Sequence, residues 1–91
     1  MVILMKRISI RDYHESMGTL IDLSDPITYE KRKRPGSINL TYDKLMLHYQ
    51  TFLKKGEPYF ILCTKGIHSK RAVAILEYYG YNVTQVSMEE D

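Results

Sequence analysis

The chain has 91 residues, of which 44% are hydrophobic and 26% charged, and its formal net charge is +2. This length suits one domain with one modest core, and the composition excludes disordered, fibrous and low-complexity chains. The small net charge does not by itself indicate binding to nucleic acid or to a membrane. The single cysteine, Cys63, excludes an intramolecular disulfide and a zinc site made of cysteines. We therefore expect a single domain over residues 1–91 and a cytoplasmic, reducing environment.

Short apolar runs predict the strands of the fold. They do not alternate with polar residues, which is typical of strands buried on both faces. The clearest run is framed by Gly56 and Pro58 at its start and by Gly66 after its end. The last run is rich in β-branched residues and follows Gly80. The predicted strands cover residues 7–9, 20–23, 37–40, 59–63 and 82–86.

Helices are predicted between these strands. Asp25 and Pro26 form a helix start, because a capping carboxylate precedes a proline at the first helical position. The last helix has apolar residues at a spacing near 3.6 and stops at Gly80. The predicted helices cover residues 11–17, 26–30, 41–54 and 69–79. Because strands and helices alternate, we predict an α/β fold with a mainly parallel central sheet of about five strands, flanked by helices on both faces.

The segment that is expected to carry the chemistry follows the apolar run at residues 59–63. Ligands of open parallel sheets bind beyond the carboxyl ends of the strands, and Cys63 lies at that position. The residues after it read Thr-Lys-Gly-Ile-His-Ser and lead into a helix. Such a loop can turn backbone N–H groups inward as an anion-binding nest, and Gly66 gives the backbone freedom that this requires. The helix dipole and nearby cations are expected to stabilise a thiolate.

Two interpretations of Cys63 stay open at this point. A lone cysteine at the end of a strand is commonly a small buried hydrophobic residue. The basic, glycine-containing loop and the helix after it instead favour a nucleophile. A nucleophilic sulfur in a cradle for negative charge suits attack on an anionic or sulfur-bearing substrate.

Three short motifs occur along the chain. Leu-Ile-Asp-Leu-Ser-Asp-Pro starts at Leu20, Lys-Arg-Pro-Gly-Ser-Ile-Asn starts at Lys33, and Cys-Thr-Lys-Gly-Ile-His-Ser starts at Cys63. In this order and at these separations they resemble the signatures of the single-domain rhodanese family of sulfurtransferases. Those signatures are apolar-Ile-Asp-apolar-Arg with an acidic residue, His-Ile-Pro-Gly-Ala-Ile-Asn, and an active-site loop of Cys, two residues, Gly, two residues and Ser. The resemblance covers residues 8–86 and implies a rhodanese-like fold.

The resemblance also implies a thiosulfate sulfurtransferase with Cys63 as its catalytic residue. Cys63 would take the outer sulfur of a donor such as thiosulfate as a persulfide, and a thiol or cyanide would then remove it. No metal or organic cofactor is implied. Expected partners are a small anionic sulfur donor, an external thiol acceptor and a sulfur-relay protein, with no nucleic acid and no membrane. The implied substrate-binding residues are those of the loop: Thr64, Lys65, Gly66, Ile67, His68 and Ser69.

The chain departs from the family pattern at several positions. Ser24 stands where the family usually has Arg, Lys33 where it usually has His, and His68 where many members have Arg. The family usually continues after the last strand with Gly-Gly and a segment containing Trp, whereas this chain ends at Asp91 and has no Trp. We therefore expect altered polar support of the loop, and a covering element that is missing or supplied by a partner.

Two other functions are weighed against sulfur transfer. A cysteine phosphatase needs an arginine six residues after the cysteine, so that its guanidinium meets two phosphate oxygens. Ser69 occupies that position, and the nearest arginine is Arg71. The other alternative is a rhodanese-like module that is not catalytic and serves interaction or thiol sensing.

Several other polar and aromatic residues have structural interpretations. Asp22 is expected to hydrogen-bond nearby backbone, because a buried carboxylate needs partners. The basic run at residues 31–34 is expected to be a solvated loop, or else to add positive charge at the mouth of the pocket. Tyr79 is expected in the core, and Tyr78 and Tyr81 are expected as exposed contacts.

Overall fold

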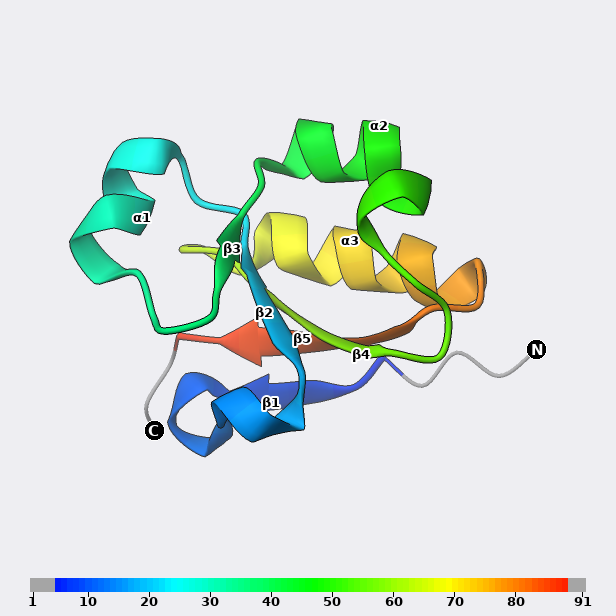
Figure 1. The fold of residues 1–91 in the computed structure, drawn as a ribbon, viewed down its shortest axis with the longest axis horizontal. Helices are drawn as coiled ribbons and strands as arrows, with labels where there is room; N and C mark the ends of the chain where they lie inside the picture. The colour runs from blue at the N-terminus through cyan, green and yellow to red at the C-terminus, as the bar shows by residue number, and fades with distance from the viewer. Residues whose placement is uncertain (1–4, 89–91) are drawn as a thin grey trace.

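The computed structural model of the chain describes residues 5–88 and contains one five-stranded sheet (Figure 1). The strand order is β1-β5-β4-β2-β3, and every neighbouring pair is parallel. The predicted α/β class and parallel sheet are confirmed. In chain order the elements are β1 (Arg7–Ser9), two 3-10 turns (Ile10–Asp12 and Glu15–Met17), β2 (Thr19–Asp22), α1 (Pro26–Arg32), β3 (Ile38–Asn39), α2 (Tyr42–Phe52), β4 (Pro58–Leu62), α3 (Ile67–Tyr78) and β5 (Asn82–Ser87).

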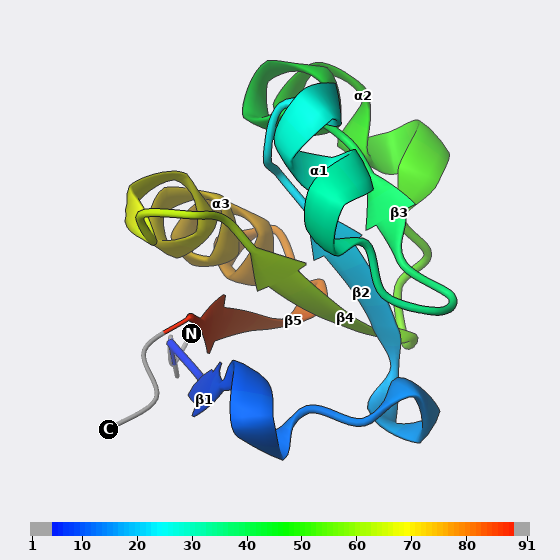
Figure 2. The same ribbon diagram turned by 90° about the vertical axis from the view of Figure 1, so that its left-hand side faces the viewer.

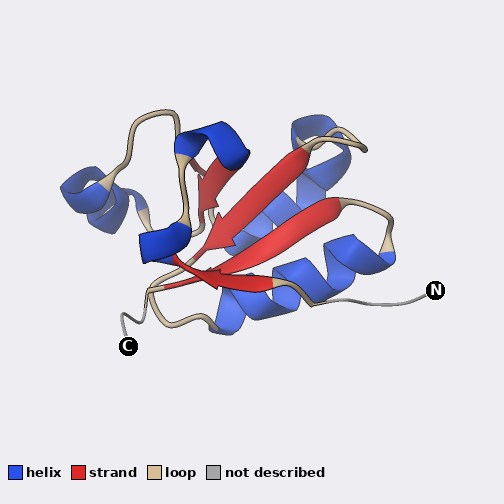
Figure 3. Ribbon diagram, turned by 90° about the horizontal axis from the view of Figure 1, so that it is seen from below, coloured by secondary structure: helices blue, strands red, loops and turns tan. Residues whose placement is uncertain are grey.

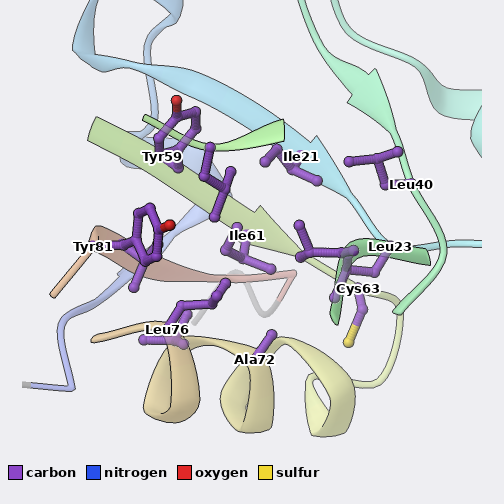
Figure 4. Close-up of a cluster of buried hydrophobic side chains, with 13 residues drawn as sticks. Ile21, Leu23, Leu40, Tyr59, Ile61, Cys63, Ala72, Leu76 and Tyr81 are labelled. Atoms are coloured by element: carbon purple, nitrogen blue, oxygen red, sulfur yellow. The ribbon is translucent and has the colours of Figure 1, made fainter. Parts of the chain in front are cut away.

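One face of the sheet carries the larger core. Because side chains alternate along a strand, Tyr59 and Ile61 of β4 point to this face. Leu45 of α2 and Leu76 of α3 pack onto them and are fully buried. Figure 4 shows these apolar side chains gathered between the strands and α3, with Cys63 at one end of the cluster. In Figure 3, where the sheet is seen from below, the long helices lie behind the strands.

The opposite face carries a smaller core covered by the two 3-10 turns. Phe60 and Leu62 of β4 point to this face and pack with Ile10. Tyr13, between the turns, places its ring 5.2 Å from that of Phe60 and donates a hydrogen bond to the Gly18 carbonyl at 2.6 Å. Helical structure therefore flanks both faces as expected, but unequally, with long helices on one face and single turns on the other.

The prediction of one helix over residues 11–17 is wrong, because the segment forms two separate turns with extended backbone at Tyr13 and His14. The chain must pass here from β1 to β2, which lie three positions apart in the sheet. With strands about 4.8 Å apart this is a distance of about 14 Å, whereas a seven-residue helix is only about 10 Å long. The extended residues supply the missing length.

The assignment of the tyrosines around Gly80 is also wrong for two of them. Tyr81 is 8% exposed and belongs to the larger core, whereas Tyr79 is 46% exposed. Gly80 has φ +98° and turns the chain out of α3, so that Tyr81 packs edge-on against Tyr49. Tyr79 stacks on the outer side of Tyr49, and Tyr78 is exposed as expected.

Within the described part of the chain, every helix is too short or too polar to span a bilayer. The expectation of a missing covering element concerns the end of the chain, and residues 89–91 lie outside the described residues.

Two leucines of α2 test how this helix contributes to stability. Leu45 is fully buried, whereas Leu47 is 76% exposed. Leu45→Ala is expected to lower the free energy of unfolding by about 2–5 kcal/mol, because it removes apolar contacts and leaves a cavity. Leu47→Ala makes the same chemical change in the same helix and is expected to cost less than about 0.5 kcal/mol. Urea denaturation measures both, and equal losses would contradict the packing described above.

Candidate active site

The site lies at the carboxyl end of β4, the middle strand of the sheet. Its neighbours are β5 on one side and β2 on the other, and α3 begins just after it. Figure 2 looks onto this end of the sheet. A position where neighbouring strands connect in opposite directions leaves a crevice at their carboxyl ends. Cys63 is the first residue after β4 and is 7% exposed.

The sulfur of Cys63 is held by the first turn of α3. The backbone N–H groups of Gly66 and Ser69 donate to Sγ at 3.1 Å and 3.3 Å, and the thiol lies 3.5 Å from the Ser69 hydroxyl oxygen. Gly66 precedes the helix with φ +78°, and no side chain caps this end. The sulfur therefore takes the place of the usual capping oxygen. Two N–H dipoles aimed at one atom stabilise negative charge on it.

Two further N–H groups of the same turn lack a protein acceptor. Among the described residues, none accepts a hydrogen bond from the backbone N–H of Ile67 or of His68. Both residues line the same pocket as Cys63. These N–H groups can donate hydrogen bonds to a negatively charged atom that is bound to the sulfur.

The pocket over the sulfur has a volume of about 500 Å³. The ring of Tyr42, from α2, stacks on that of His68 with centroids 4.8 Å apart and planes at 22°. Hydrogen bonds from Thr28 to the carboxylate hold the pKa of Asp25 below its ordinary value. The lining residues are Leu23, Ser24, Asp25, Thr41, Tyr42, Asp43, Cys63, Thr64, Lys65, Ile67 and His68.

Comparison with known proteins identifies the family. The sequence profile of the rhodanese-like domain matches residues 4–88. The chain belongs to the rhodanese-like domain family. This membership places it among domains of sulfur transfer and their relatives.

Solved structures agree with this assignment. A rhodanese-related protein from Thermoplasma volcanium is 25% identical with a TM-score of 0.81, over 90% of this chain and 83% of that one. The reduced CoADR-RHD of Bacillus anthracis is 26% identical with a TM-score of 0.76, over 90% of this chain. A NAD-dependent persulfide reductase from A. fulgidus shares the fold at 19% identity, with a TM-score of 0.74 over 92% of this chain. The domain spans only 15% of each of these two longer chains.

The rhodanese-like loop contains all the predicted site residues, in two roles. Thr64, Lys65, Ile67 and His68 line the pocket together with Cys63. Gly66 and Ser69 lie on its inner side, where their N–H groups contact the sulfur.

At position 24, where the family usually has an arginine, this chain has Ser24, and a different arginine contacts that serine. Arg32, at the end of α1, donates to the hydroxyl of Ser24 and to the carboxylate of Asp22, the latter at 3.3 Å. The Ser24 hydroxyl is in turn 3.3 Å from that of Thr64 in the loop. The Arg32 guanidinium therefore supports the loop indirectly, through the Ser24 hydroxyl and its contact with Thr64. Sequence reasoning placed Arg32 in a solvated run and missed this role.

The other polar expectations have mixed outcomes. Asp22 accepts from the backbone N–H of Ser24 at 2.9 Å, so its structural interpretation is confirmed. Lys33 pairs with Glu30 at 3.3 Å on an exposed part of α1 and its cap, and it does not line the pocket. Tyr42 and Asp43 of α2 line the pocket but were not identified from the sequence.

Gln85 of β5 is a second support that sequence reasoning missed. Its Nε2 donates to the Gly66 carbonyl at 3.2 Å and to the Ser69 hydroxyl at 3.3 Å, and it is 8% exposed. The Ser69 hydroxyl donates to the same carbonyl at 3.2 Å. A glutamine among the β-branched residues of a buried strand was the available signal, because a buried amide must find partners.

Gln85→Met tests this support, with Thr84→Val as its control. The methionine removes both side-chain hydrogen bonds of Gln85, so we expect the free energy of unfolding to fall by about 1–3 kcal/mol. We also expect faster hydrogen exchange at the Gly66 and Ser69 amides, measured by NMR. Thr84 is buried on the opposite face, and its substitution should leave exchange at these two amides unchanged. The same exchange rates in both variants would show that Gln85 does not hold the loop.

Proposed function

We propose that this rhodanese-like domain is a sulfurtransferase in which Cys63 carries the transferred sulfur as a persulfide. The observation that carries the proposal is that Cys63 lines a pocket while the N–H groups of Gly66 and Ser69 donate to its Sγ. A thiolate is the nucleophilic form of cysteine, and these donors favour it. The N–H groups of Ile67 and His68 are available for the charge of the outer sulfur.

The reaction has two substitution steps at sulfur. In the first, the Cys63 thiolate attacks the outer sulfur of a donor such as thiosulfate. The new bond joins Sγ to that sulfur, the donor S–S bond breaks, and sulfite leaves with the electron pair. In the second step, an acceptor thiolate or cyanide takes the outer sulfur and Cys63 leaves as a thiolate. Neither step requires an external oxidant or reductant, and we place the reaction in the reducing cytosol.

The charges of the pocket bear on the choice of donor. Lys65 lines the pocket and attracts an anion, whereas the carboxylates of Asp25 and Asp43 line it and repel one. Asp25 also caps α1 through Thr28, so its carboxylate is fixed in place. A dianionic donor such as thiosulfate therefore enters against partial repulsion.

The geometry is less favourable to the two alternatives. A cysteine phosphatase would need an arginine facing Sγ, but Arg71 lines a different hollow and not the pocket of Cys63. A purely structural cysteine would have no need of a pocket of about 500 Å³ over its sulfur. A non-catalytic module stays the alternative to be tested.

Intact-protein mass spectrometry tests the proposed persulfide. After incubation with thiosulfate we expect a gain of about one sulfur atom, roughly 32 Da, because the thiolate forms a covalent intermediate. Reduction with a thiol should remove it, and Cys63→Ser should never show it. If the folded protein gains no sulfur from thiosulfate or from any other sulfane donor, the sulfurtransferase proposal is wrong and the non-catalytic module is favoured.

Asp43→Asn tests the repulsion between the carboxylates of the pocket and a dianionic donor. It removes one negative charge from the pocket and should increase the rate of persulfide formation with thiosulfate several-fold, with a larger effect at low salt. A neutral polysulfide donor should react at the same rate with both proteins. An equal increase for the neutral donor would attribute the effect to altered packing and not to charge.

A further inference from the structure

A second hollow lies on the other side of the Cys63 loop. Its volume is about 740 Å³, and among the described residues that line it four are basic and none is acidic. We call it the basic groove. Its lining residues are Met5, Arg7, Lys65, Gly66, Ile67, Lys70, Arg71, Ala74 and Gln85.

Three of these cations have no carboxylate partner within residues 5–88. Lys65, Lys70 and Arg71 are exposed, and among residues 5–88 no acidic side chain forms an ion pair with any of them. Arg7, which also lines the groove, donates to the Ser87 hydroxyl at 3.3 Å. The like charges of Lys65, Lys70 and Arg71 create a positive potential that attracts an anionic ligand.

The basic groove is continuous with the Cys63 pocket. Lys65 and Ile67 line both hollows, and Ile67 is 62% exposed between them. The pocket is also lined by Asp25 and Asp43, which do not line the basic groove. An exposed apolar residue surrounded by charges is typical of the centre and rim of a protein interface.

We propose that the basic groove docks an acidic segment of a partner protein whose thiol receives the sulfur from Cys63, an inference that rests on the proposed function. These 91 residues contain one cysteine, so the acceptor thiol lies outside them. The pocket and the basic groove share Lys65 and Ile67, so one extended segment can contact both. A protein segment reaches across Ile67, with its cysteine in the pocket and its carboxylates against Lys70 and Arg71.

The transfer balances without a further reactant. The partner's thiolate attacks the outer sulfur of the Cys63 persulfide, a bond forms between those two sulfurs, and the bond from Sγ to the outer sulfur breaks. Cys63 leaves as a thiolate, and the partner holds the persulfide.

The experiment uses three synthetic peptides of equal length. Each has one central cysteine, flanked by glutamates, by glutamines or by lysines. The protein is loaded with sulfur, and the initial rate of transfer to each peptide is measured by mass spectrometry and divided by the rate to 2-mercaptoethanol. At low salt we expect the glutamate peptide to receive sulfur about tenfold faster than the glutamine peptide, because charge complementarity increases association. High salt should remove the advantage.

Charge reversal locates the effect. K70E/R71E should abolish the preference for the glutamate peptide, whereas R11E/K54E, an equal charge change outside both hollows, should keep it. The proposal is overturned if the glutamate and glutamine peptides react equally, or if the preference survives in K70E/R71E. It is also overturned if 3-mercaptopropionate shows the same tenfold advantage over 2-mercaptoethanol, because a small anion would then suffice.

Binding separates this proposal from the proposed function. Fluorescence anisotropy of the labelled glutamate peptide with Cys63→Ser needs no sulfur chemistry, and K70E/R71E in that background should weaken binding about tenfold. If Cys63 cannot be loaded but this binding is observed, the sulfurtransferase proposal fails while the docking surface stands. Absence of binding to Cys63→Ser at low salt overturns the docking surface.

Discussion

Two backbone N–H groups, those of Gly66 and Ser69, converge on the sulfur of Cys63, and much of the surrounding structure keeps them there. Convergence requires that β4 end where α3 begins, and the larger core fixes both elements through their buried faces. It also requires a left-handed residue before the helix, which Gly66 supplies with φ +78°. Gln85 ties this residue to β5 from inside. The chemistry of one atom thus depends on two strands, a helix and a glycine.

The parts of this arrangement that are local in sequence could be predicted. The apolar runs predicted every strand, and the order of Cys63, Gly66 and Ser69 predicted the loop, because each signal lies within a few neighbouring residues. The supports could not be predicted in the same way. Arg32 reaches Ser24 from eight residues away, and Gln85 reaches Gly66 from 19 residues away. Such contacts exist only once the sheet has brought α1 and β5 to the same end.

Where local preference competes with sheet geometry, the geometry decides. A helix was predicted through Tyr13 and His14, yet the distance between β1 and β2 imposes extended backbone there. Gly80 similarly rotates the chain, so that Tyr81 becomes a core residue and Tyr79 does not. For Tyr13 and His14 the deciding constraint is the distance between two strands that are not neighbours in the sheet, which composition and periodicity do not encode. At Gly80 the deciding constraint is the local turn, whose direction fixes which tyrosine enters the core.

Although the net charge is only +2, acidic and basic residues are separated at the site. Asp25 and Asp43 lie in the pocket above the sulfur, while Lys70 and Arg71 lie in the groove on the other side of the loop. In the proposed reaction a donor must enter the pocket to reach Sγ, whereas an acceptor protein can also contact the groove. The two reactants therefore place their negative charge in different parts of the site. A free dianion in the pocket is repelled by the aspartates, whereas acidic residues of a partner in the groove are attracted by Lys70 and Arg71. Because field strength falls with ionic strength, the balance between donor and acceptor steps depends on salt.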